Sequence, residues 1–186
     1  MTGLTLGIIG LSLTVLLCGI GSGLGLKATA SASAGVLAED PKKFGKVIVL
    51  TLLPATQGLY GFLIALIGAN ALPTVANLGS SGANDAQIMA QGWNVIVACL
   101  PMMIGGMVSA ILQGKAAAST IIAVGKNSET SRAFLFPAMI EFYALLGMVV
   151  SIILFNYFPV SDVANIVVPA KEAADGLQSL AALLVR

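Results

Sequence analysis

Four long apolar stretches divide this sequence of 186 residues, and they constrain its fold more than any other feature. The stretches run over about 4–26, 44–69, 92–124 and 133–158. A helix rises about 1.5 Å per residue, so the 4–26 stretch covers about 35 Å, enough to cross a bilayer core. Only 9% of the residues are charged, against about 25% in an average soluble domain. We therefore predict an all-α membrane protein with four transmembrane helices.

Polar connections between these stretches set the predicted boundaries. We expect a first transmembrane hairpin in residues 1–69, a loop in 70–91, a second hairpin in 92–158 and a tail in 159–186. The tail carries apolar side chains at helical spacing, which is compatible with an amphipathic helix. The N-terminus has no basic region before its apolar run, so we interpret that run as a retained membrane helix and not as a signal peptide.

Basic residues are concentrated in two of the connections, and this predicts the orientation. Seven of the nine lysines and arginines lie in or beside the turns within the hairpins, and the 70–91 loop has none. They are Lys27, Lys42, Lys43, Lys46, Lys115, Lys126 and Arg132. The positive-inside rule places both turns in the cytoplasm, with both termini and the long loop on the opposite side. The net charge of +1 gives no indication of a nucleic-acid partner.

The second half of the chain repeats the first in the same order. The aligned pairs are Pro54 with Pro137, Ala55 with Ala138 and Tyr60 with Tyr143 at an offset of 83, and Lys27 with Lys115 and Ala28 with Ala116 at an offset of 88. Both hairpins therefore have the same orientation. This parallel repeat differs from the inverted repeats of many secondary transporters.

Small and aromatic residues are divided between the helices. Gly106, Ala110, Gly114 and Ala118 recur every four positions, which is typical of closely packed membrane helices. Ten of the eleven aromatic residues lie in the second helix of a hairpin or just before it. We expect a ring of copies, with the helices over 4–26 and 92–124 inside and those over 44–69 and 133–158 outside.

Glu141 is the one acid within the 133–158 stretch. A charge at the centre of a membrane helix costs about 2.5–3.5 kcal/mol, so such residues usually have a function. We predict that Glu141 binds and releases a small cation. Its counterpart in the repeat is Gly58, so the two hairpins share one ion site.

Polar side chains at the same depth supply further oxygens. Thr56, Gln57 and Tyr60 share one helix face near the level of Glu141, and Gln113 reaches that depth from the third apolar stretch. A carboxylate, a hydroxyl and two amide carbonyls suit a hard cation. A backbone carbonyl near the helix break at Pro54 can add another ligand, and Tyr60 can donate to the acid. Each residue alone has an ordinary helix-packing role, so the prediction depends on the combination.

These residues carry a resemblance to a known family. The strings Leu53-Pro54-Ala55-Thr56-Gln57-Gly58-Leu59-Tyr60-Gly61-Phe62 and Pro137-Ala138-Met139-Ile140-Glu141 resemble the double-hairpin proteolipid of the rotor ring in V-type and A/V-type rotary ATPases, known as the c or K subunit. The similarity covers about residues 4–158 and is greatest to the sodium-binding branch. It implies a sodium site whose ligands are the backbone carbonyl of Leu53 and the side chains of Thr56, Gln57, Gln113 and Glu141, with Tyr60 bonding the acid.

The resemblance also implies partners and a location. It implies a ring of about ten identical copies, a stator subunit with an essential arginine, a central-stalk subunit on the cytoplasmic turns, and surrounding lipid. Such a protein is not an enzyme on its own, carries Na⁺ or H⁺ with no organic cofactor, and resides in the cytoplasmic membrane of a prokaryote. The 159–186 tail and the 70–91 loop depart from the family's short form.

Three alternatives remain open at this stage. A proton-translocating rotor of the same family needs only the acid and one polar neighbour, and the four further oxygen donors favour sodium over it. A stand-alone four-helix channel or small-solute transporter needs a polar path through one chain, whereas these polar residues cluster at one level. A structural proteolipid without an ion site leaves Glu141 without a role.

Overall fold

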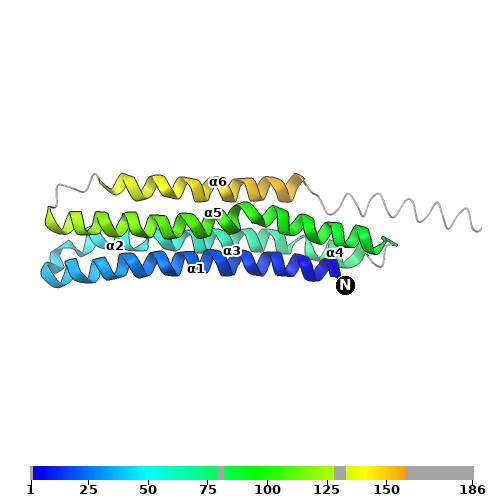
Figure 1. The fold of residues 1–186 in the computed structure, drawn as a ribbon, viewed down its shortest axis with the longest axis horizontal. Helices are drawn as coiled ribbons and strands as arrows, with labels where there is room; N and C mark the ends of the chain where they lie inside the picture. The colour runs from blue at the N-terminus through cyan, green and yellow to red at the C-terminus, as the bar shows by residue number, and fades with distance from the viewer. Residues whose placement is uncertain (1, 79–81, 128–132, 158–186) are drawn as a thin grey trace, which may run out of the picture.

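The computed structural model describes residues 2–78, 82–127 and 133–157, and within these ranges the chain is helical apart from short connections (Figure 1). In chain order the elements are α1 (Thr2–Glu39), a 3-10 turn η1 (Pro41–Lys43), α2 (Phe44–Leu52), a 3-10 turn η2 (Leu53–Ala55), α3 (Thr56–Ala69), α4 (Leu72–Leu78), α5 (Asp85–Lys126) and α6 (Leu135–Tyr157).

Four helical segments lie side by side along the long axis of the molecule (Figure 1). Each is long and apolar enough to cross a membrane. They are Gly3–Glu39, Pro41–Leu78, Asp85–Lys126 and Leu135–Tyr157. This arrangement confirms the predicted double hairpin of four membrane-spanning helices.

Helices α1 and α5 pack backbone against backbone. A Cβ atom at Gly21 would lie 2.6 Å from the carbonyl oxygen of Met107, and one at Gly25 would lie 2.6 Å from that of Ala110. Side chains larger than hydrogen do not fit at these two positions, so the glycines allow the close helix approach that small residues give in membranes. The two small-residue helices of the sequence thus form the central contact of the fold.

The predicted 70–91 loop is shorter than expected, because both of its ends are helical. Helix α4 occupies part of it, and α5 begins at Asp85 instead of near residue 92. The Asn84 side chain accepts a hydrogen bond from the Gln87 backbone N–H, and the Gln87 side chain accepts one from the Asn84 N–H. This capping box starts α5 about two turns before the predicted position. The predicted amphipathic helix in 159–186 lies outside the described residues.

Candidate ion-binding site

A break in the second membrane-spanning segment positions the candidate site. Pro54 has no backbone N–H, so the α-helical ladder cannot continue through it. The chain forms the 3-10 turn η2 there, and the Leu53 carbonyl accepts from the backbone N–H of Thr56. The break predicted at Pro54 is therefore confirmed as a tight turn that separates α2 from α3.

The counterpart of Pro54 has a different place in its helix. Pro137 is the third residue of α6, where a backbone N–H has no partner within the helix, so its absence costs no helical bond. Its carbonyl oxygen accepts from Gln113 Nε2 at 3.0 Å. This acceptor was not predicted from the sequence, because the carbonyl expected near Pro54 is that of Leu53, whose counterpart is Phe136.

Glu141 lies about one turn further along α6 and receives donors from both hairpins. Its Oε1 accepts from Thr56 Oγ1 at 2.7 Å and from the Tyr60 hydroxyl at 2.8 Å. Its Oε2 accepts from Gln113 Nε2 at 2.7 Å. The half-buried carboxylate is thus held between α3, α5 and α6, and every side chain predicted for the site lies in this cluster.

The Thr56 hydroxyl lies among more oxygens than it has hydrogens. Its Oγ1 is 2.8 Å from the Leu53 carbonyl oxygen, 2.7 Å from Glu141 Oε1 and 3.3 Å from Gln57 Oε1. A hydroxyl carries one hydrogen, so it can donate along only one of these contacts. A group of four oxygens from a carbonyl, a hydroxyl, an amide and a carboxylate can coordinate a hard cation, and unwound backbone carbonyls serve this purpose in membrane transporters.

The two glutamines form a buried pair. Gln57 and Gln113 are both fully buried, and Gln57 Nε2 donates to Gln113 Oε1 at 2.6 Å. In this arrangement Gln57 turns its oxygen toward Thr56, whereas Gln113 turns its nitrogen toward Glu141. Gln113 Oε1 has a second lone pair, so the amide–amide bond by itself does not prevent it from coordinating a cation.

The charge of Glu141 has no opposite charge beside it in the described part of the chain. The ion pair formed there joins Lys43 to Asp40, at 3.6 Å, and lies away from the cluster. One carboxylate can be neutralised by one monovalent cation or one proton. No group of three or more His, Cys, Asp or Glu side chains comes together in residues 2–78, 82–127 and 133–157, so a transition-metal site is not indicated there.

The corresponding level of the first hairpin has no acid. Gly58 is the counterpart of Glu141, and Ser22 lies against it, with Oγ 3.1 Å from the position of a Cβ at Gly58. The Ser22 hydroxyl is buried and has no hydrogen-bond partner within the described residues. The acid-centred cluster therefore occurs at one of the two equivalent levels.

Comparison with known proteins identifies relatives that cover most of the chain. The family model for the C subunit of ATP synthase matches twice, over residues 9–68 and 96–154. The chain is 39% identical over 153 residues to the V-type sodium ATPase subunit K of Enterococcus hirae, across 82% of this chain and 91% of that protein. It is also 39% identical over 152 residues to the A-type ATP synthase subunit K of Methanocaldococcus jannaschii, across 81% and 62%. The two matched ranges agree with the two repeats found in the sequence.

Proposed function

The chain belongs to the family of the ATP synthase C subunit, and from that premise we propose that each copy binds one sodium ion at Glu141 and carries it through the bilayer as a ring of copies rotates. The protein is a multi-pass membrane component of a rotary ATPase and has no catalytic activity of its own. Members of this family form oligomeric rings within the rotary complex. We propose the identity of the ion, the residues that bind it and the neighbouring subunits.

The observation that carries the proposal is the group of oxygens around Thr56. The Leu53 carbonyl, Gln57 Oε1 and Glu141 Oε1 all lie within 3.3 Å of one hydroxyl oxygen. A proton needs only one acceptor oxygen, whereas this group supplies several oxygen atoms that can coordinate a cation. The relative in Enterococcus hirae is named a sodium ATPase subunit, which supports the choice of ion.

Charge neutralisation couples binding to rotation in this proposal. An ionised carboxylate exposed to lipid is costly, whereas a carboxylate with a bound cation is close to neutral and can pass through the bilayer. The donors from Thr56, Tyr60 and Gln113 hold the carboxylate between the helices. The sodium-loaded copy can therefore face lipid, and the empty copy is retained near a compensating charge.

A partner must supply that compensating charge. The sequence has no arginine in its four apolar stretches. We assign the role to an arginine of a stator subunit, which pairs with Glu141 after sodium leaves. The basic turns near Lys43 and Lys126 face the cytoplasm and a central-stalk subunit, in a ring of about ten copies.

Sodium protection of Glu141 tests the proposal. A carbodiimide modifies a carboxyl group, so we expect sodium to slow modification of Glu141 in the purified ring at fixed pH. Potassium at the same ionic strength is the control and should give little protection. Equal rates of modification with and without high sodium would contradict a sodium site.

One observation favours a second candidate, a proton carrier. Gln113 donates its amide N–H to Glu141 Oε2, and such a hydrogen bond also suits a carboxyl group that carries a proton, because the protonated group keeps acceptor capacity. For a proton carrier, the rate of carbodiimide modification should change with pH and stay the same at every sodium concentration.

A further inference from the structure

A group of three hydroxyl side chains lies next to the helix break that positions the candidate site. Thr29 and Ser33 belong to α1 and are buried, and Thr51 belongs to α2 and is half-buried. Thr29 Oγ1 donates to the Thr51 carbonyl oxygen at 2.9 Å, and Ser33 Oγ lies 2.6 Å from Thr51 Oγ1. Ser33 Oγ also lies 2.7 Å from the Thr29 carbonyl oxygen. These contacts connect α1 to the last residues of α2 before the break.

The break leaves the Thr51 carbonyl without its usual helical partner. In an α-helix this carbonyl would accept from the N–H of Ala55, four residues further on. Ala55 belongs to the 3-10 turn η2, in which an N–H bonds to the carbonyl three residues back. Thr29 Oγ1 lies closer to the Thr51 oxygen than to the carbonyl oxygens of its own helix, at 3.1 Å for Leu26 and 3.4 Å for Gly25. A hydroxyl of α1 therefore replaces the missing backbone donor, as Ser and Thr side chains do at breaks in membrane helices.

Comparison of the two hairpins shows that these hydroxyls accompany the break. At the offsets of 88 and 83, their counterparts in the second hairpin are all apolar. The counterparts are Ala117 for Thr29, Ile121 for Ser33 and Phe134 for Thr51. Pro137 lies in the first turn of α6 and interrupts no helical bond, so no carbonyl there needs a substitute donor. The hydroxyls are thus present in the hairpin whose helix is broken and absent from the equivalent positions of the other.

The broken turn carries two of the proposed ligands. Leu53 is the first residue of η2 and Thr56 directly follows the turn, so both lie within five residues of Thr51. The Leu53 carbonyl oxygen lies 2.8 Å from Thr56 Oγ1, which in turn lies 2.7 Å from Glu141 Oε1. Because the turn is short, a shift of the Thr51 carbonyl would move the Leu53 carbonyl relative to Glu141.

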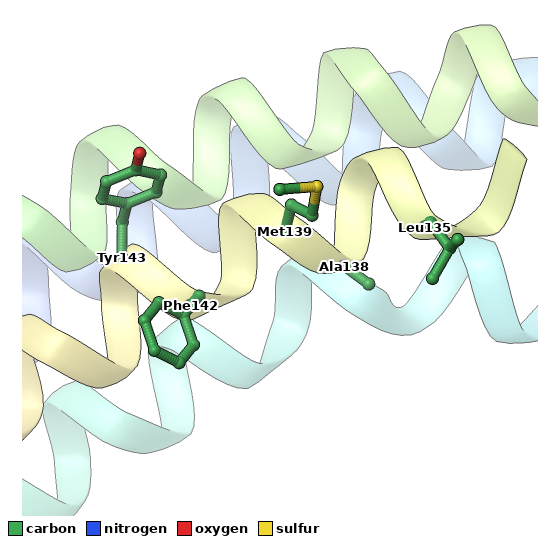
Figure 2. A pocket seen from close by; sticks show the side chains of 5 residues that line it. All are labelled: Leu135, Ala138, Met139, Phe142 and Tyr143. Carbon is green, nitrogen blue, oxygen red and sulfur yellow. The ribbon is translucent and has the colours of Figure 1, made fainter.

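The surface of α6 next to Glu141 gives no comparable support. An apolar groove of about 410 Å³ lies along α6 and is lined by Leu135, Ala138, Met139, Phe142 and Tyr143 (Figure 2). Apart from the Tyr143 hydroxyl and the weakly accepting Met139 sulfur, these side chains have no hydrogen-bonding atoms. The polar contacts around the site therefore come from α1, α3 and α5 and not from this groove.

We propose that Thr29 is a positioning residue for the ion site. By bonding the Thr51 carbonyl it fixes the η2 turn, and it thereby sets how tightly the site binds sodium. The proposal rests on the proposed sodium site and adds a residue that does not touch the ion, since the contacts of Thr29 Oγ1 are to the carbonyls of Gly25, Leu26 and Thr51. Removal of a group that holds a ligand in place commonly changes metal affinity about 10–100-fold.

Sodium protection of Glu141 from a carbodiimide tests this role in the purified full-length ring at fixed pH. Thr29→Val keeps the side-chain volume and removes the hydroxyl, so half-protection should need about tenfold more sodium. Thr29→Ser keeps the hydroxyl and should restore the native sodium dependence. The matched control is Thr14→Val, because Thr14 is an equally buried threonine of α1 that donates to Gly10 of its own helix at 2.8 Å. Its sodium dependence should equal that of the native ring, whatever change in Tm either valine variant shows.

The possible outcomes separate this role from the proposed function. Native sodium dependence in Thr29→Val, or an equal change in Thr14→Val, would overturn the inference and leave the sodium site standing. A native ring that sodium does not protect would contradict the sodium site, and this inference with it. If Thr29→Val forms no ring, Thr29→Cys decides the matter, because a thiol is a weaker donor than a hydroxyl. Thr29→Cys should need more sodium than Thr29→Ser, and equal requirements would overturn the inference.

Discussion

At the scale of single residues, the setting of Glu141 decides what this chain can do. Three donors fix a carboxylate that no described lysine or arginine neutralises. Hydrogen bonds to a charged group contribute about 1.5–3 kcal/mol each, so these donors fix the position of the carboxylate. A carboxylate that keeps both its position and its charge is suited to exchange a cation.

Replacement of Glu141 by glutamine tests this role directly. Glu141→Gln keeps the shape of the side chain and removes its charge, so the site can no longer balance a cation. We expect ATP-driven sodium uptake into vesicles to be abolished, while a ring still forms on a native gel. Full coupled uptake by this variant would refute the assignment of the ion site.

Replacement of Thr56 tests the oxygen cluster. Thr56→Val keeps the side-chain volume and removes the hydroxyl that lies among Leu53, Gln57 and Glu141. One lost ligand of about 1.4 kcal/mol corresponds to a tenfold change in affinity, so about tenfold more sodium should be needed to protect Glu141. The matched control is Thr120→Val, since Thr120 is a buried threonine of α5 that bonds its own helix at Ala116. Equal sodium dependence in both variants would argue against Thr56 as a ligand.

At the scale of elements, close packing of α1 on α5 sets the distance between the hairpins. The Cβ positions at Gly21 and Gly25 are blocked by backbone carbonyls of α5, and these atoms cannot rotate away as side chains do. Helix α5 carries Gln113 and touches α6, so a shift of α5 would move the donors around Glu141.

A glycine pair tests this packing. Gly25→Ala places a methyl group 2.6 Å from the Ala110 carbonyl oxygen and should destabilise the fold by about 1–3 kcal/mol through overpacking. Gly23→Ala is the control, because nothing lies within 4 Å of its Cβ and alanine favours helix. Thermal melting of the purified protein should show a lower Tm for Gly25→Ala than for Gly23→Ala. Equal melting temperatures would mean that the close approach of α1 and α5 is not needed.

At the scale of the whole molecule, the exposed surface indicates a component of a larger assembly. Aromatic side chains such as Phe136 and Tyr143 are exposed on α6, whereas the polar cluster lies between the helices. A stand-alone channel would need polar side chains along a continuous path, but the cluster occupies one depth. The family's oligomeric ring gives each copy both lipid and protein neighbours.

Native mass separates these two architectures. One chain has a mass of 18.8 kDa, and the detergent-purified protein should run as a single species many times that mass and resist SDS. A monomer or dimer would favour the channel or small-solute transporter. Native mass spectrometry also counts the copies, which we expect to be about ten.

The sequence by itself determined the four membrane helices, the repeat and the residue types gathered near Glu141, because hydropathy and a lone acid are local properties that the bilayer constrains strongly. It did not determine the early start of α5 at Asp85, where a capping box overrode the polar composition. Only the tertiary structure decided that Gln113 offers nitrogen to the acid, and that the Ser22 hydroxyl opposite Gly58 has no hydrogen-bond partner among the described residues. The orientation of an amide and the partners of a buried hydroxyl depend on which atoms of neighbouring helices come together, and residue spacing along the chain does not specify these.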